Sequence, residues 1–151
     1  MQATFRPATM ADLDTVLRFS RALYEHDHSA FDAPRMRQAL VGLLDAPPWG
    51  RVYVIESDGA PVGYLVLTFG YSLEYRGRIA LIDELFIAEA QRGQGLGRAA
   101  LAFAESEGRA LGITALHLEV DRANTHAQAV YHASGFFSHD RLLMAKWVGD
   151  E

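Results

Sequence analysis

The sequence contains no cysteine, which excludes disulfide bonds, thiolate zinc sites and cysteine nucleophiles. It also has no excess of basic charge, because 14 Lys and Arg residues face 19 Asp and Glu residues, a formal net charge of −5. This balance excludes a global basic field for nucleic acid, so we expect no nucleic-acid partner. No apolar run approaches the roughly 20 residues that cross a bilayer, so we expect no membrane partner.

The N-terminus lacks the apolar stretch of a signal peptide, because Asp12 and Asp14 fall where that stretch would have to lie. We therefore expect a soluble, cytoplasmic protein. Half of the 151 residues are hydrophobic and 22% are charged, which is the composition of a globular chain rather than a disordered one. The length fits one compact domain, residues 1–151, and no internal repeat or linker divides it.

Periodicity and turn signals predict an α/β fold with a mixed sheet. We expect strands at residues 3–6, 51–56, 61–69, 79–87, 113–120, 136–138 and 142–147. We expect helices from residue 13 to about 24, from 34 to before Pro47, from the end of a glycine-rich segment to about 111, and at 124–134. Thr9 and Asp12 have the spacing of a capping box ahead of the first helix, and residues 57–60 carry a hairpin signal.

The glycine-rich segment 92–98 lies between a buried strand and a helix. Glycine lets a backbone approach a ligand closely, and the start of the following helix offers free N–H groups that suit a phosphate. A Walker A loop is excluded because no Lys-Ser/Thr pair follows Gly97, and the G-x-G-x-G spacing fits a dinucleotide fingerprint poorly. A tight strand-to-helix turn without any ligand is the alternative.

Three motifs occur in one order along the chain. They are the strand 83–87, the Arg-x-x-Gly-x-Gly of residues 92–97, and Asn124-x6-Tyr131-x3-Gly135-Phe136. In this combination the sequence resembles the GNAT superfamily of acyl-CoA-dependent N-acetyltransferases over essentially its whole length. The resemblance implies a GNAT-like mixed, mostly antiparallel central sheet flanked by about four helices in a single domain.

The resemblance also implies acetyl-CoA as the cosubstrate. Backbone amides of the loop would bind its pyrophosphate, a role shared by Arg92, Gly93, Gln94, Gly95, Leu96, Gly97 and Arg98. The backbone of Leu85, Phe86 and Ile87 would pair with the pantetheine arm, as in β-augmentation. Asn124 would meet the same arm, although asparagine is also a common helix N-cap and both roles are compatible.

Acetylation of an amine needs a base for the amine proton and an acid for the departing thiolate. Tyr131 matches the family tyrosine whose hydroxyl faces the cofactor sulfur, which would make it the acid for the thiolate. The alternative is that Tyr131 only packs its ring against the protein. Asp83 and Glu84 lie in an apolar strand, where burial would raise the pKa of a carboxyl group and suit a base. The base could be either residue. We favour Asp83, because the resemblance matches it to the residue that acts as the base in diamine and polyamine acetyltransferases, the nearest subgroup in pattern. Pairing of a strand-end carboxylate with Arg76 or Arg78 is the alternative.

Acidic residues at the end of the first helix are candidates for binding the acceptor. Glu25 or Asp27 would hold a cationic amine, as acidic residues of the corresponding helix do in polyamine acetyltransferases, whereas a solvated helix end is the plain alternative. His26 and His28 have only an i, i+2 spacing without further ligands, so we expect no metal. His117 could face the acceptor cleft from its strand.

We therefore expect direct transfer of an acetyl group from acetyl-CoA to a primary amine of a small cationic molecule, through a ternary complex. Two other functions stay open. One is acetylation of a protein N-terminus or lysine, because residues 118–124 also resemble ribosomal-protein N-acetyltransferases. The other is a non-catalytic acyl-CoA sensor, which would need neither Tyr131 nor the acidic pair. The resemblance is compatible with a homodimer, because isologous dimers are common in the family.

Overall fold

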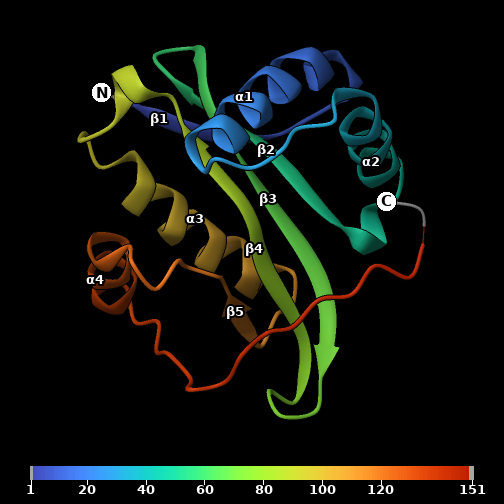
Figure 1. Ribbon diagram of the computed structural model, residues 1–151. Helices are drawn as coiled ribbons and strands as arrows, with labels where there is room; N and C mark the ends of the chain where they lie inside the picture. The colour runs from blue at the N-terminus through green and yellow to red at the C-terminus, as the bar shows by residue number, and fades with distance from the viewer. Residues whose placement is uncertain (1, 150–151) are drawn as a thin grey trace. The chain divides into compact units, whose positions relative to one another are not determined.

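A computed structural model describes residues 2–149, which form two compact units, 2–119 and 120–149. The first unit is built on a five-stranded sheet with strand order β1-β2-β3-β4-β5. The strands are β1 (Ala3–Pro7), β2 (Gly50–Ser57), β3 (Ala60–Ser72), β4 (Gly77–Ile87) and β5 (Ala115–His117). The first four strands pair with one another in antiparallel fashion, and β5 runs parallel to β4 (Figure 1). The mixed, mostly antiparallel sheet is therefore confirmed.

The helices begin and end within two residues of the predicted positions. The first unit contains α1 (Leu13–His26), α2 (Ala33–Asp45) and α3 (Leu96–Ala110), with short 3-10 turns at Met10–Asp12, Pro47–Trp49 and Glu89–Gln91. The Thr9–Asp12 capping box is present just before α1. Within residues 2–149, every helix is too short or too polar to cross a membrane.

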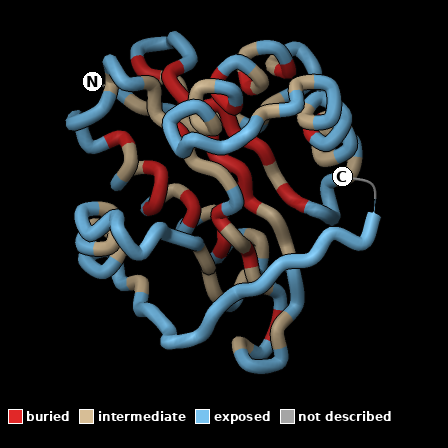
Figure 2. The backbone as a smooth tube through the Cα atoms, in the orientation of Figure 1, coloured by how far each residue is buried: buried red, intermediate tan, exposed pale blue. Residues whose placement is uncertain are grey.

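The sheet buries both of its faces. Alternate residues of the strands pack with α1 and α2 in one cluster, whose buried members are Leu13, Val16, Phe19, Leu40, Val52, Val54, Tyr64, Val66 and Phe86. On the other face, Phe103 of α3 stacks on Phe5 at 4.7 Å and meets Tyr53 edge-on at 4.9 Å. Buried backbone is concentrated in the central strands and the inner sides of the helices (Figure 2).

A tight turn and a close backbone contact place β3 beside its two neighbouring strands. The hairpin predicted at residues 57–60 joins β2 to β3, and it turns through Asp58 and Gly59, both at positive φ, as a two-residue turn of this kind requires. Opposite β4, a Cβ atom on Gly63 would lie 2.0 Å from the carbonyl oxygen of Phe86. Only glycine therefore allows β3 to approach the end of β4 this closely.

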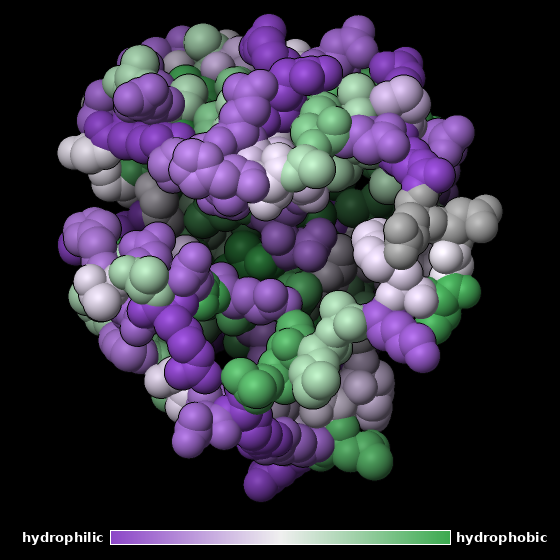
Figure 3. Space-filling model, in the orientation of Figure 1, coloured by the Kyte–Doolittle hydropathy of each residue, from purple (hydrophilic) through white to green (hydrophobic). Residues whose placement is uncertain are grey.

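The second unit contains one helix, α4 (Thr125–Ala133), which Asn124 caps and which ends before Gly135 at φ +96°. Residues 136–149 form neither helix nor strand, so the strands predicted at 136–138 and 142–147 are wrong. The apolar pattern there reflects strand propensity, but a strand exists only where a neighbour completes its hydrogen bonds. Apolar side chains stay exposed among hydrophilic ones instead (Figure 3), namely Leu142, Leu143, Met144, Trp147 and Val148.

Candidate active site

One edge of β4 is open towards its C-terminal end. The parallel partner β5 pairs only with residues 79–81 and then ends at His117, whereas the sequence predicts a strand from 113 to 120. No other described strand takes its place beside residues 82–87 (Figure 1). This half of β4 therefore presents free backbone N–H and C=O groups on one side. Phe86 is 7% exposed and packs on Phe19, so it can reach a ligand only through its backbone.

The glycine segment that follows β4 also presents free donors. Gly93 and Gly95 have φ values of +78° and +83°, and Gly95 precedes α3 without any side-chain cap. The first N–H groups of α3 therefore have no partner within the helix. A Cβ atom added at Gly93, Gly95 or Gly97 would meet no atom within 4 Å, so the space above the loop is open. The loop has the geometry of an anion site.

Arg92 fixes the junction between β4 and this loop. Its Nε donates to the carbonyl oxygen of Ile87 at 2.9 Å, and its guanidinium lies 5.5 Å from the centre of the Phe86 ring. At the other end of the loop, the side chain of Leu96 is 3% exposed and anchors the start of α3 in the core. The loop is thus held at both ends, and its middle is free to bind.

A β-bulge places both carboxylates of β4 at one cavity. The register against β3 passes from Val66–Glu84 to Leu67–Ile82, so Asp83 is an extra residue in β4. In a regular strand, Asp83 and Glu84 would point to opposite faces. With the bulge, Glu84 shares the face that packs with α1, and Asp83 lines the same cavity as Glu84.

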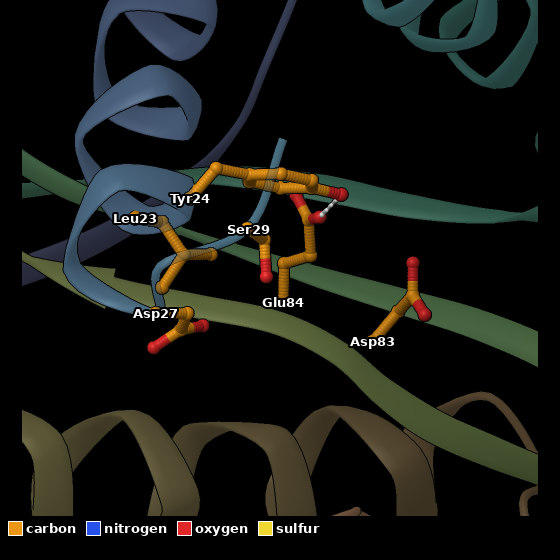
Figure 4. A pocket seen from close by; sticks show the side chains of 6 residues that line it. All are labelled: Leu23, Tyr24, Asp27, Ser29, Asp83 and Glu84. Atoms are coloured by element: carbon orange, nitrogen blue, oxygen red, sulfur yellow. Dashed lines mark hydrogen bonds between the residues drawn. The ribbon is translucent and has the colours of Figure 1, made fainter. Parts of the chain in front are cut away.

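The cavity has a volume of about 260 Å³ and lies between the end of α1 and β4 (Figure 4). Its lining residues are Leu23, Tyr24, Asp27, Ser29, Asp83 and Glu84. Three of the six are carboxylates, and in Figure 4 Asp27 and Asp83 lie on either side of Glu84. Such a lining favours a ligand with positive charge.

Glu84 is held by two tyrosines. The hydroxyl of Tyr24 on α1 donates to Oε2 at 2.8 Å, and the hydroxyl of Tyr64 on β3 donates to Oε1 at 2.8 Å. Burial raises the pKa of Glu84, the two hydrogen bonds lower it, and the charges of Asp83 and Asp27 raise it, with a net upward shift. Burial and the Glu84 carboxylate also raise the pKa of both tyrosines, which therefore remain donors.

Among the described residues, neither the Asp83 carboxylate nor the Asp27 carboxylate has a hydrogen-bonding partner, in contrast to that of Glu84. Asp83 is exposed, although the sequence predicts a buried strand here. The surrounding protein nevertheless desolvates its carboxyl group enough to raise the pKa. Asp83 forms no ion pair with an arginine in the described part of the chain, so the alternative role as a paired carboxylate is not supported. Arg78 instead donates to the carbonyl oxygen of Leu111.

The wall opposite β4 comes from the turn that ends α1. The N–H of His28 donates to the Glu25 carbonyl and the N–H of Ser29 to the Tyr24 carbonyl, with His28 at φ +56°, which is a Schellman motif. This turn places Asp27 and Ser29 on the cavity wall, whereas Glu25 is not among the lining residues. Within residues 2–149, no group of three or more His, Asp or Glu side chains is arranged to hold a metal ion.

The other predicted residues are not among those that line this cavity. His117 ends β5, and its ring meets Tyr75 edge-on at 4.6 Å. In the second unit, Oδ1 of Asn124 accepts the N–H of Ala127 at 3.0 Å, so the N-cap role is confirmed and the side-chain amide donors remain available. Tyr131 packs edge-on against Phe136 at 6.1 Å, and burial raises the pKa of its hydroxyl.

Sequence reasoning missed Tyr24, Ser29 and Tyr64 as parts of the site. Tyr24 fits the apolar period of α1, and its hydroxyl gives no separate signal. Tyr64 does give a signal in the sequence, because it places a hydroxyl group within the otherwise apolar run 62–67, where a buried O–H needs a hydrogen-bonding partner. That partner is one of the two acidic residues of the neighbouring strand.

The acetyltransferase (GNAT) family matches residues 13–136 in sequence. No curated protein matches the chain. Among solved structures, an integron cassette protein from the mobile metagenome of Cole Harbour Salt Marsh is 31% identical. Its TM-score is 0.84 over 97% of this chain and 91% of that one.

Two more distant structures share the fold with this chain. An aminoglycoside N-acetyltransferase in complex with CoA is 15% identical, with a TM-score of 0.81 over 98% of this chain and 96% of that one. A predicted acetyltransferase with acetyl-CoA, from Clostridium acetobutylicum, is 15% identical, with a TM-score of 0.80 over 96% of both chains. At this identity the likeness shows the fold alone.

Proposed function

Because the chain belongs to the acetyltransferase (GNAT) family, we propose that it transfers an acetyl group from acetyl-CoA to a primary amine of a small cationic molecule, directly and in a ternary complex. The observation that carries the choice of acceptor is the cavity with three carboxylates between α1 and β4. A diamine is the simplest fitting ligand, with one ammonium group at Asp27 and the reacting amine at Asp83.

The residues that would hold acetyl-CoA fit its parts. The free amides at the start of α3 suit the pyrophosphate, and the open edge of β4 at Leu85, Phe86 and Ile87 suits the amides of the pantetheine arm. The structure of the Clostridium acetobutylicum protein with acetyl-CoA supports this cosubstrate. When bound, acetyl-CoA supplies a thioester, whose acyl group passes to the amine nitrogen as its C–S bond breaks.

Two protons move in this reaction, and the chain offers a group for each. We assign the amine proton to Asp83, because both oxygens of Glu84 already accept a tyrosine hydroxyl. We assign protonation of the departing thiolate to the Tyr131 hydroxyl, on the family resemblance. Its raised pKa keeps that hydroxyl protonated and able to donate.

Thiol release tests this function. We expect acetyl-CoA to release free thiol only when an amine is added, from a panel of spermidine, an amino acid, an aminoglycoside and a short peptide. Mass spectrometry should find the acetyl group on the amine. Binding of acetyl-CoA without thiol release for any member would instead support the non-catalytic sensor. Release with the peptide alone would support acetylation of a protein.

Replacing Tyr131 with phenylalanine should lower kcat by about 10²-fold, the usual effect of a positioned acid, while the affinity for acetyl-CoA stays near that of the wild type. The hydroxyl acts chiefly on the developing thiolate, and the ring that packs against Phe136 is kept. Pre-steady-state kinetics should show that chemistry limits turnover under the conditions used. An unchanged kcat there removes Tyr131 from the mechanism.

A further inference from the structure

Tyr24 makes three contacts that join the end of α1 to β4. Its hydroxyl donates to Oε2 of Glu84 at 2.8 Å, across 60 positions of sequence. Its carbonyl oxygen accepts the N–H of Ser29 at 2.8 Å, which closes the turn after α1. Its ring meets Phe31, further along the same loop, edge-on at 5.4 Å.

The turn after α1 has little else to hold it against the sheet. Residues 27–30 are exposed, and in the described part of the chain none of them makes a hydrogen bond to a strand. The bond from Tyr24 to Glu84 is therefore the direct polar link between the wall that carries Asp27 and the strand that carries Asp83. The other groups facing Glu84 are Tyr64 from β3 and the two aspartates themselves.

We propose that Tyr24 is a positioning residue for the acceptor: its hydrogen bond to Glu84 sets the separation of Asp27 and Asp83, and thereby the length of the diamine that the cavity selects. This inference rests on the proposed function. In this proposal, Glu84 binds the end of α1 through the Tyr24 hydroxyl, and Asp83 alone takes the amine proton. Asp27 and Asp83 lie on either side of Glu84 in this cavity (Figure 4), so movement of one wall changes the separation of the two aspartates and hence the chain length that reaches both.

Tyr24→Phe tests the inference against a matched control, Tyr64→Phe. Each variant removes one hydroxyl donor from the same carboxylate, but only Tyr24 comes from α1. The probes are 1,3-diaminopropane, 1,4-diaminobutane and 1,6-diaminohexane, with KM and kcat measured for each. Amide hydrogen exchange at Ser29 supplies a readout that needs no activity, and circular dichroism verifies that both variants are folded.

For Tyr24→Phe we expect KM for the best diamine to rise about 10-fold, the effect of losing a hydrogen bond to a charged group. We expect kcat to change less than KM, the preference among the three chain lengths to flatten, and exchange at Ser29 to become faster. For Tyr64→Phe we expect the chain-length preference and the exchange at Ser29 to stay as in the wild type.

Two results overturn the positioning role. One is a Tyr24→Phe variant that keeps both the chain-length preference and the exchange rate at Ser29 of the wild type. The other is an equal flattening of the preference in both variants, which would place the effect in the charge of Glu84. Faster exchange in Tyr24→Phe alone, in a protein that acetylates no amine, would support the link to α1 and reject the proposed function.

Discussion

Replacing Gly97 with aspartate is expected to weaken acetyl-CoA binding by about 10³-fold without unfolding the protein, because like charges brought together cost several kcal/mol. Gly97 lies in the first turn of α3, and a Cβ atom there would meet no atom within 4 Å. An acidic residue at a helix N-terminus is favourable for the helix itself. The substitution should therefore leave the free energy of unfolding unchanged or higher, while its carboxylate repels the pyrophosphate.

The measurement is the rise in melting temperature with added acetyl-CoA, supported by calorimetric titration. A ligand that binds only the folded state raises stability by mass action, so a loss of affinity removes the rise. Gly42→Asp is the matched control, because Gly42 lies on α2 with equally open surroundings. It should respond to acetyl-CoA as the wild type does. Wild-type affinity in folded Gly97→Asp would show that this loop does not bind the pyrophosphate.

Replacing Asp83 with asparagine is expected to lower kcat/KM by about 10³-fold near neutral pH, within the range for a general base. The loss should shrink at high pH, where free amine becomes abundant without a base. Desolvation raises the pKa of Asp83 above its value in the unfolded chain, so ionisation of this carboxyl group lowers the free energy of unfolding as the pH rises, and the full cost is present above the raised pKa. Asparagine removes this cost, and stability at neutral pH should stay equal or rise.

Asp27→Asn provides the contrast on the opposite wall. Asp27 lines the cavity but takes no proton in this mechanism, so its loss should raise KM for a diamine and spare kcat, the mark of lost uniform binding. The pH–rate profiles of the two variants separate the roles. A profile for Asp83→Asn that runs parallel to that of the wild type would transfer the role of base to Glu84 or to a chain of water molecules.

Local signals in the sequence predicted the framework of the site. Thr9 and Asp12 fixed the start of α1 because capping needs only residues close in sequence. The glycines of the segment 92–98 marked a strand-to-helix turn because positive φ restricts the choice of residue. The apolar run of β4 predicted a buried strand, and the helices α1 and α3 both pack against β4.

Features that depend on distant partners could not be predicted in this way. The bulge at Asp83 is a mismatch of register between two strands, and neither strand shows it alone. The link from Tyr24 to Glu84 joins residues 60 positions apart. Residues 142–147 have a strand-like composition, but no described strand pairs with them, and propensity does not supply a partner.

The preference between 1,4-diaminobutane and 1-aminobutane tests the central claim most directly. Both offer the same reacting amine, and only the diamine carries a second positive charge for the carboxylates beside Asp83. With acetyl-CoA saturating, we expect kcat/KM to favour the diamine by about 10-fold or more, the effect of one further hydrogen-bonded charge. Equal values, or faster acetylation of 1-aminobutane or of the anionic 4-aminobutanoate, would contradict a cavity that selects cationic amines.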